Sequence, residues 1–358
     1  MTKRFAGRIP DRVDALVAGA GPAGLSAALH LARVGASVLL VDVRLRIGHP
    51  ARCGEITGKN FFELLGLERR QEWVRLEIAR RPRSSKRVLV LDRPRCEEGL
   101  AAVVAGMGGW VRAGTTVVGV GEFDGRERIV TLARGRERHA VRAGVVVAAD
   151  GASSTVGRMA GLDTRLPLSG VAPGLAFRVD GCELAHPEAM IIQPLPPPYP
   201  PVPYYFWVIP NGPDSANVGL GLSGREGPRA PELLRRLLAA SPDVRGGRVV
   251  ETLAGVIPDV RPLQRPVRDG LVVVGGAARL INPLNGGGIR LAIRSGGAAA
   301  RAIEKRAAVG PFTEQALWPE YEQLVRHQVE KLEKQWKERE RLESRVRSKG
   351  GLQSRGRR

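Results

Sequence analysis

The chain has 358 residues, of which 43% are hydrophobic, and 56 Lys and Arg against 36 Asp and Glu give a net charge of +20. This size suits two domains, and the composition excludes a disordered or fibrous protein. No apolar run approaches the roughly 18–20 residues that a membrane-spanning helix needs, and residues 1–12 lack the apolar core of a secretory signal. Cys53, Cys96 and Cys182 are scattered without metal-ligand spacing, so we expect reduced thiols, no metal site and a cytoplasmic protein.

The large positive charge is compatible with three kinds of surface. It suits a nucleic-acid partner, an anionic membrane, or an Arg-rich surface that is merely solvated. Aromatic residues make up only 4% of the chain, and we find no nucleic-acid-binding module, so specific nucleic-acid binding is not expected. Because anionic lipid attracts each nearby Lys or Arg by about 1 kcal/mol, we expect peripheral contact with the cytoplasmic face of a membrane.

The N-terminal part of the chain has the pattern of a βαβ unit. The apolar run Val13–Ala18 predicts a buried strand, and the helical spacing of apolar residues over 25–35 predicts a helix that ends at Gly35. Ser37–Asp42 is a second apolar run of strand length. Strand, helix and strand in this order favour a parallel sheet covered by helices.

Three glycines with the spacing G-x-G-x-x-G join the first predicted strand to the helix. Gly19 permits a tight turn, Gly21 lets a pyrophosphate approach the backbone, and Gly24 lets the helix pack closely on the strand. The start of the helix adds amide donors and a partial positive charge. Asp42 stands 18 positions after Gly24, where an acid takes the ribose hydroxyls. A glycine-rich turn without a ligand is the alternative, and the complete pattern favours a dinucleotide.

Further along, strand-like and helix-like segments alternate. Residues 74–92 alternate loosely as in a sheet, residues 94–106 predict a helix, and residues 144–150 predict a strand. Residues 270–302 have the pattern of a strand followed by a helix, and the segment from about Phe312 predicts one long charged helix with a basic tail.

The middle of the chain, residues 162–265, is rich in strand-like runs and carries a proline cluster at 194–205. Such a cluster is either a polyproline ligand or, inside a domain, a stiff loop beside a sheet, which we favour. Tyr205 and Trp207 alternate along a predicted strand, so their side chains point to one face. They predict either the aromatic wall of a binding site or a pair in the core of the sheet.

Two further segments have features of flavin-binding proteins. Asp150-Gly151 ends a predicted strand, and Arg93 precedes a predicted helix. Taken alone, the first is readable as a plain turn and Arg93 as a surface charge. In this order after the glycine motif, they resemble the second FAD fingerprint and the Asp-Arg segment of the aromatic-hydroxylase group. In that group the arginine lies over the flavin pyrophosphate.

A third fingerprint of this group is expected at residues 271–296, where the turn reads Gly275-Gly276 and a run of three glycines follows. In the group an Asp at the second position bonds a ribityl hydroxyl, whereas Gly276 has no side chain. A hydrogen bond to a charged group contributes about 1.5–3 kcal/mol. We therefore expect FAD to bind about ten- to a hundredfold more weakly than in relatives with Asp.

Two more motifs resemble those of the geranylgeranyl reductase family. Its Pro-x-x-Cys-Gly segment near the flavin is matched by Pro50, Cys53 and Gly54. Its Tyr-x-Trp-x-Phe-Pro motif and the following Gly-x-Gly are matched by Tyr205, Trp207, Ile209, Pro210, Gly219 and Gly221. The resemblance runs from about Val13 to Ala302. The chain departs from the family at Cys96-Glu97, where Phe-Asp is usual, and in its short C-terminal region.

The resemblance implies an α/β (α+β) fold with two interleaved domains. A Rossmann-like FAD/NAD(P)-binding domain would comprise residues 1–60, 86–162 and 266–305. An antiparallel-sheet substrate domain would comprise residues 61–85 and 163–265, and residues 306–358 would form a charged C-terminal helix and basic tail.

The resemblance also assigns roles to individual residues. The expected cofactor-binding residues are Gly19, Gly21, Pro22, Ala23, Gly24, Asp42, Val43, Arg52, Cys53, Arg93, Asp150, Gly151, Gly276, Pro283, Gly286, Gly287, Gly288 and Ile289. The expected substrate-binding residues are Tyr205, Trp207, Pro210 and Gly219. Cys53 would otherwise be read as a small buried hydrophobe. Its place in the family motif makes Cys53, or a water that it orders, the candidate catalytic group on the side of proton delivery.

The function implied is FAD-dependent saturation of isoprenoid double bonds, with the geranylgeranyl chains of archaeal-type ether phospholipids as the lipid substrate. An isolated alkene has no polar group through which an enzyme could activate it. A hydride donor and a proton source must therefore be aligned with its two carbons. NADPH, NADH or a ferredoxin, which would be an electron-donor protein, would meet the flavin directly, since no second nucleotide fingerprint is found. The alternatives are an FAD-dependent monooxygenase of the aromatic-hydroxylase group acting on a small apolar substrate, and a non-catalytic flavin-fold protein that binds an anionic surface.

Overall fold

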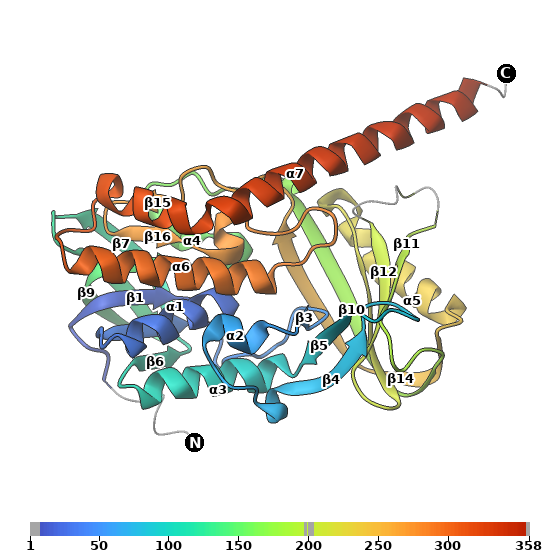
Figure 1. Cartoon of the computed structure of the whole chain (residues 1–358), viewed down its shortest axis with the longest axis horizontal. Coiled ribbons are helices and arrows are strands. Elements are labelled where there is room, and N and C mark those ends of the chain that lie inside the picture. The colour runs from blue at the N-terminus through green and yellow to red at the C-terminus, as the bar shows by residue number, and fades with distance from the viewer. Residues whose placement is uncertain (1–7, 197–198, 200–203, 356–358) are drawn as a thin grey trace.

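The computed structural model describes residues 8–196, 199 and 204–355. Two β-sheets lie side by side, each with helices on an outer face, and a long C-terminal helix crosses one end of the molecule (Figure 1). The interpretation of the proline cluster as a stiff loop falls largely on residues 197–198 and 200–203, which lie outside the described residues. No helix in the described ranges is long and apolar enough to cross a membrane.

The larger sheet has eight strands in the order β15-β16-β9-β1-β2-β6, and the β7–β8 hairpin extends from β9. Its strands are β1 (Arg12–Ala18), β2 (Val38–Asp42), β6 (Trp110–Ala113), β7 (Thr116–Phe123), β8 (Arg128–Arg134), β9 (Glu137–Ala148), β15 (Val267–Arg268) and β16 (Leu271–Val273). Strands β16, β9, β1, β2 and β6 run parallel. The carboxyl ends of parallel strands share one edge of a sheet, which is where such folds bind nucleotides. The Rossmann-like prediction is confirmed.

Three helices cover one face of this sheet: α1 (Pro22–Arg33), α3 (Arg93–Gly106) and α6 (Ile289–Ala307). The same core holds one set of alternate β1 residues, such as Ala15 and Val17, and the other set packs on the opposite face beneath β7 and β8. Helix α1 begins after the glycine turn that follows β1, as predicted. It ends two residues before Gly35, whose φ is +78°.

Helices α1 and α6 approach so closely that only glycine fits between them. A Cβ atom added to Gly296 of α6 would lie 2.1 Å from the carbonyl oxygen of Ala23 in α1. The start of α1 is therefore in close contact both with the turn after its own strand and with α6. The helix N-terminus is thereby held at the carboxyl edge of the sheet.

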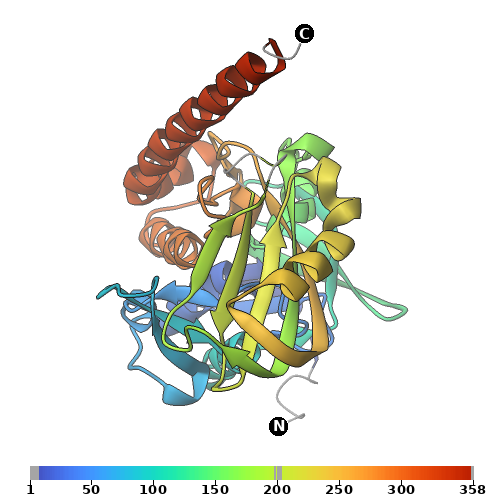
Figure 2. The same cartoon turned by 90° about the vertical axis from the view of Figure 1, so that its right-hand side faces the viewer.

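The second sheet is antiparallel, with the strand order β11-β12-β13-β10-β14. Its strands are β10 (Val171–Leu184), β11 (Ile191–Pro194), β12 (Tyr205–Pro210), β13 (Ser215–Gly221) and β14 (Val244–Pro258). Helix α5 (Ala230–Ala240) packs Leu234 on the outer face, together with Phe206 and Leu220 (Figure 2). Because side chains alternate along a strand, Tyr205, Trp207 and the residues beside them point inward, toward the first sheet.

A small sheet of β3 (Ile56–Gly58), β5 (Arg87–Leu91) and β4 (Val74–Ala79) joins the two larger ones, with α2 (Phe61–Leu65) beside it. The predicted boundary between residues 85 and 86 falls between the paired strands β4 and β5. The remaining short helices and turns are Gln71–Trp73, Gly151–Ser153, α4 (Thr155–Met159), Leu168–Gly170, Gly224–Arg229 and Gly275–Ala278. The domain limits stay predictions.

The predicted C-terminal helix is present as α7 (Glu314–Arg355). Its first half buries Leu317, Tyr321 and Leu332, and its last turns extend away from the body of the molecule (Figures 1 and 2). Where it leaves the body, Arg339 is only 8% exposed and pairs with Asp259, which follows β14.

The contact between α1 and α6 predicts a large penalty for one added methyl group. Gly296→Ala should lower the free energy of unfolding by about 1–3 kcal/mol, as overpacked cores do. Gly106→Ala is the matched control, because Gly106 also lies in a helix but has nothing within 4 Å of an added Cβ. It should leave stability unchanged or raise it by up to about 1 kcal/mol. Urea denaturation midpoints compare the two, and equal midpoints would contradict the packing argument.

Candidate active site

The first glycine turn leaves open backbone where a phosphate group is expected. Gly19 has φ +109°, and an added Cβ would lie 2.4 Å from the carbonyl oxygen of Ala149. An added Cβ at Gly24 would lie 1.8 Å from the carbonyl oxygen of Gly19. At Gly21, which caps α1, nothing in the described part of the chain comes within 4 Å of that position. The turn is therefore closed toward the protein and open at the helix N-terminus, which fits a pyrophosphate.

The three expected fingerprints meet at the carboxyl ends of β1, β9 and β16. An added Cβ at Gly276 would lie 3.7 Å from Cα of Gly151, and one at Gly275 would lie 2.7 Å from Cβ of Ala23. Segments more than a hundred residues apart thus lie against one another at this edge of the sheet, where the cofactor cleft is expected. Backbone without side chains at these glycines fits the close approach of FAD, and Gly276 has ordinary van der Waals room for an added Cβ.

Asp150 has one acceptor oxygen to offer within this cradle. Its Oδ2 accepts a hydrogen bond from the amide of Val156 at 2.9 Å, while its buried Oδ1 has no partner among the described residues. Burial raises the pKa of the Asp150 carboxyl above its ordinary value. A buried acceptor without a partner is costly, so the geometry suits a ligand donor such as a cofactor hydroxyl.

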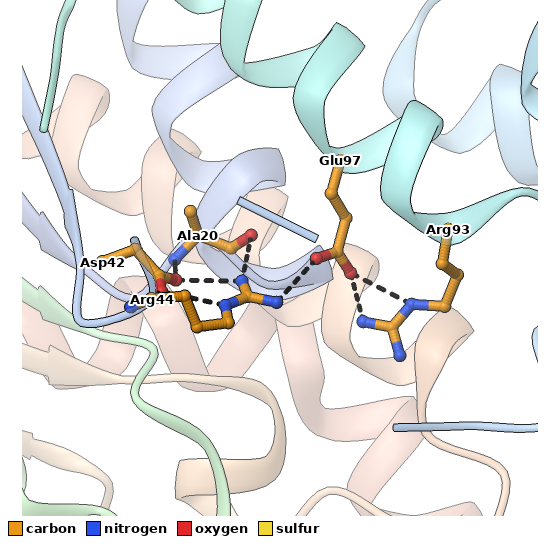
Figure 3. Close-up of polar contacts among 5 residues, drawn as sticks. All are labelled: Ala20, Asp42, Arg44, Arg93 and Glu97. Carbon is orange, nitrogen blue, oxygen red and sulfur yellow. Dashed lines mark hydrogen bonds and ion pairs between the residues drawn. The ribbon is translucent and has the colours of Figure 1, made fainter. Parts of the chain in front are cut away.

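A chain of four charged side chains borders the same turn (Figure 3). Asp42, at the end of β2, accepts from the amide of Ala20 at 2.6 Å and from the guanidinium of Arg44 at 2.9 Å. Arg44 also donates to Glu97 at 3.1 Å and to the carbonyl of Ala20 at 3.1 Å. Glu97 in turn accepts from Nε of Arg93 at 3.0 Å. The chain joins β2 to α3 and holds Arg93, the expected pyrophosphate ligand, in place.

This arrangement keeps Asp42 and Arg44 ionised. Burial alone would raise the pKa of Asp42, but the hydrogen bonds and charge of Arg44 outweigh it and hold the pKa below its ordinary value. Burial likewise opposes the charge of Arg44, and Asp42 and Glu97 raise its pKa nonetheless. Both carboxylate oxygens of Asp42 already have donors, so its expected bond to a ribose would be shared with Arg44.

Two members of the chain, Arg44 and Glu97, were not among the residues expected from the sequence. Glu97 stands four positions after Arg93, the spacing at which a helix brings opposite charges together, and that signal was readable. Arg44 follows Asp42 by two positions and has no comparable signal.

A cavity of about 140 Å³ lies between the cofactor cleft and the inner face of the antiparallel sheet. Tyr205 and Trp207 line it with ring centroids 5.7 Å apart, beside Cys53 and the loop that carries Pro283 and Gly286. The Tyr205 hydroxyl donates to the carbonyl of Asn285 at 2.8 Å, and burial raises its pKa to about 12. The cavity therefore lies between the predicted aromatic wall and the third fingerprint.

Glycines in the sheet make room for the aromatic rings. An added Cβ at Gly219 would lie 2.3 Å from Cζ2 of Trp207, so the indole occupies the space of the missing side chain. Gly174, Gly221 and Gly255 line the same cavity. The expected role of Gly219 in substrate binding stays a prediction, and its structural effect is to seat Trp207.

The loop with Cys53 is fastened to the sheet by an amide side chain. Asn217 of β13 donates through Nδ2 to the carbonyl of Cys53 at 3.2 Å and accepts from Nε1 of Trp207 at 2.8 Å. It lies two residues before Gly219 on the same face of the strand. Sequence reasoning did not single out Asn217, although its alternation with the Gly-x-Gly motif indicated its orientation.

The other expected residues lie around these two spaces. Pro22 and Ala23 begin α1, and Gly287, Gly288 and Ile289 lead into α6. Arg52 lines the cavity on its exposed side. Val43 is 66% exposed, and Pro210 is at the end of β12, outside the residues that line the cavity. All these assignments stay predictions.

The C-terminal helix reaches the edge of the cavity. Arg339 pairs with Asp259, with 2.8 Å between Nη2 and Oδ2, and its guanidinium stacks on Trp336 at 4.8 Å from the ring centroid. It also approaches the carbonyl of Pro283 at 3.5 Å. Since Asp259 and Pro283 both line the cavity, Arg339 joins two of its walls. In the described ranges, no three His, Cys, Asp or Glu side chains gather as a metal site requires.

Comparison with known protein families agrees with this geometry. The family described as "FAD dependent oxidoreductase" matches residues 85–302, and the one described as "NAD(P)-binding Rossmann-like domain" matches residues 17–65. The first match spans more than half of the chain, and the protein is accordingly an FAD-dependent oxidoreductase.

Individual relatives narrow the assignment. Digeranylgeranylglycerophospholipid reductases of Methanoculleus marisnigri and Methanospirillum hungatei JF-1 are each 33% identical to this chain, and each alignment covers 86% of it and 81% and 79% of the relative, respectively. A geranylgeranyl bacteriochlorophyll reductase-like protein from Thermoplasma acidophilum is 28% identical and superposes with a TM-score of 0.85 over 93% of this chain and 88% of its own. The chain belongs to the digeranylgeranylglycerophospholipid reductase family, which confirms the resemblance noted in its motifs.

The position of Gly276 generates a prediction about cofactor affinity. Gly276→Asp should tighten FAD about tenfold or more, because the added carboxylate can accept a hydrogen bond from the ribityl chain. The site has room, since nothing lies closer than 3.7 Å to an added Cβ. Titration of apoprotein with FAD measures the change. Gly106→Asp, which adds the same charge far from the cleft, is the control, and equal affinity in both variants would contradict this account of Gly276.

The charge chain generates a prediction about stability. Glu97 is 3% exposed and lies between two partly buried arginines, so Glu97→Gln should lower the free energy of unfolding by about 3–5 kcal/mol. Its neighbour Glu98 pairs with the largely exposed Arg46, so Glu98→Gln should cost less than about 1 kcal/mol. Denaturation curves of the two variants test the difference. Similar losses of unfolding free energy in both variants would show that the chain of charged side chains contributes no more to stability than an exposed ion pair.

Proposed function

We propose that this oxidoreductase saturates double bonds in isoprenoid chains, with the geranylgeranyl chains of archaeal-type ether phospholipids as substrate. The observation that carries the proposal is the cavity, which is bounded by the third flavin fingerprint on one side and by Tyr205 and Trp207 on the other. An apolar space that opens directly onto the cofactor suits a hydrocarbon better than a polar substrate. The names of the relatives support the same lipid class.

The size of the cavity indicates how a long chain would bind. Its volume of about 140 Å³ is below the roughly 300–1,000 Å³ of ordinary ligand sites. One unsaturated segment would lie beside Cys53, while the rest of the isoprenoid chain extends along the glycines of the antiparallel sheet that line the cavity. Other double bonds would reach the same position as the chain slides.

The residues of the cavity would bind and orient the alkene and exclude water. When bound and reduced, FAD supplies the hydride. Cys53 would hold the proton at its Sγ, on the loop that Asn217 fixes to the sheet. Tyr205, with its raised pKa of about 12, stays a neutral phenol that is hydrogen-bonded to Asn285, so it closes the cavity without adding charge.

Two partners complete the proposal. NADPH, NADH or a ferredoxin would reduce FAD directly, since the sequence carries one dinucleotide fingerprint. The net charge of +20 would hold the protein on anionic membrane, where the lipid substrate resides.

The reaction is tested by anaerobic incubation of reduced holoprotein with digeranylgeranyl phospholipid, followed by mass spectrometry of the lipid. The expected products are heavier by two hydrogens for each double bond saturated. Cys53→Ala should lower the rate about a hundredfold or more, whereas Cys182→Ala, at a buried cysteine of the sheet's outer core, should leave it unchanged. Products that gain oxygen, and only in air, would overturn the proposal in favour of a monooxygenase.

The membrane contact is tested separately by sedimentation with vesicles. Binding to vesicles of anionic phospholipid should be strong at low salt and weaken steeply as salt rises, because the attraction is screened over about 10 Å at 0.1 M. Neutral phosphatidylcholine vesicles are the control. Weak binding at low salt that does not change at high salt would rule out the electrostatic contact.

A further inference from the structure

Glu55 has a backbone and an environment that an ordinary structural carboxylate lacks. It follows Cys53 by two residues, is 1% exposed and has φ +63°, in the left-handed region that side chains other than glycine rarely adopt. Its amide nitrogen lies 3.3 Å from Sγ of Cys53, and its carbonyl accepts from the amide of Leu91 at 2.9 Å. Strained backbone of this kind persists where the surroundings enforce it, often at functional sites.

The carboxyl group of Glu55 is only partly satisfied. Oε2 accepts from Nη2 of Arg178 at 3.4 Å, and Oε1 is buried without a hydrogen-bond partner among the described residues. Burial raises the pKa of this carboxyl, against the opposing charges of Arg178, Arg75 and Arg93. Glu55 has a buried carboxyl group that is hydrogen-bonded through only one oxygen, on strained backbone. Such a group is better suited to binding and releasing a proton than to a permanent ion pair.

The antiparallel sheet holds both Glu55 and the segment that carries Cys53. Arg178 on β10 is in register with Asn217 on β13, and Asn217 fixes the Cys53 carbonyl. The charge of Arg93 acts on Glu55. Cys53 thus lines the cavity, while Glu55, two residues further along the chain, is buried and held by Arg178 of the sheet.

We propose that Glu55 holds the proton that restores the Cys53 thiol after each reduction. The proposal rests on the function proposed above. The S–H bond of Cys53 breaks as its proton bonds to one alkene carbon, while the hydride supplied by reduced FAD bonds to the other. The carboxylic acid of Glu55 then gives its proton to the Cys53 thiolate. The resulting carboxylate is stabilised by Arg178, Arg75 and Arg93 and takes up a proton from water.

The electrostatic coupling between Glu55 and Cys53 is measurable without substrate. Above the pKa of Glu55 its carboxylate disfavours the neighbouring thiolate, so Glu55→Gln should move the pH profile of Cys53 alkylation by iodoacetamide to lower pH. At pH values above the pKa of Glu55 the rate should rise several-fold. Cys96 and Cys182 are 2% and 4% exposed, and peptide mass spectrometry follows Cys53 alone. Glu251→Gln is the matched control, since Glu251 is the other carboxylate beside Arg178, at 3.2 Å, and it should leave the profile unchanged.

The groups that face Glu55 are constant in this comparison. They are Arg178 and, beyond it, Glu251 from the antiparallel sheet, Arg75 from β4, and Asp92 and Arg93 at the start of α3. An alkylation profile of Glu55→Gln that coincides with that of the wild-type protein would overturn the coupling. Equal thermal midpoints and FAD contents verify that the variants fold, and Glu55→Asp serves in their place if the Gln variant fails to fold.

Turnover separates a proton-restoring role from a structural one. Glu55→Gln leaves the Cys53 thiol itself in place, so this variant should complete the first saturation at the wild-type rate and then slow about a hundredfold. Glu55→Asp, which keeps a carboxyl, should recover part of the later rate. The wild-type steady rate should fall as pH rises through the raised pKa of Glu55, and the Gln variant should lack that limb.

The outcomes distinguish the two proposals. A Gln variant whose first and later turnovers slow equally would overturn the role of Glu55 while leaving the reductase proposal intact. A wild-type protein that saturates no isoprenoid double bond would overturn the reductase proposal. The alkylation comparison would then decide the coupling of Glu55 to Cys53 by itself.

Discussion

The structure depends on the close approach of backbone to backbone where α1 begins. The carbonyl of Gly19 lies where a Cβ of Gly24 would be, and the carbonyl of Ala149 lies where a Cβ of Gly19 would be. These contacts hold the helix N-terminus at the carboxyl edge of the parallel sheet and beside the turn after β9. The three segments that carry the flavin fingerprints are positioned from this point.

The two sides of the cofactor cleft differ in how their side chains are held in place. On the side of β2 and α3, a buried chain of alternating charges orients Arg93 through Glu97. On the side of the antiparallel sheet, Tyr205 and Trp207 form the wall of the cavity, and an amide contact from Asn217 fixes the Cys53 loop. The same enzyme thus presents cations where phosphates are expected and an apolar wall where a hydrocarbon is expected.

The sequence predicted the parts of this site that are set locally. The strand, the glycine turn and the helix from β1 to α1 depend on periodicity and on the special conformations of Gly19 and Gly24, and both are visible in a short stretch of chain. The alternation of Tyr205 and Trp207 likewise predicted a shared face. Residues whose role comes from contacts between distant segments were missed.

Arg44, Asn217 and Glu55 are examples, because each acts through partners 53 to 164 positions away. Periodicity carries no information about which distant side chain completes an ion pair or an amide bridge. The family motif pointed to Cys53, and only the folded arrangement shows that the Glu55 carboxyl is buried and held by Arg178.

The central claim is that electrons pass from FAD in this cleft to an isoprenoid double bond in the adjoining cavity. The most direct measurement is the flavin absorbance of reduced holoprotein after anaerobic mixing with digeranylgeranyl phospholipid. The account predicts that the oxidised flavin spectrum returns without oxygen, in proportion to the double bonds saturated, and that fully saturated lipid has no effect. A flavin that stays reduced with the unsaturated lipid and reoxidises only in air would contradict it.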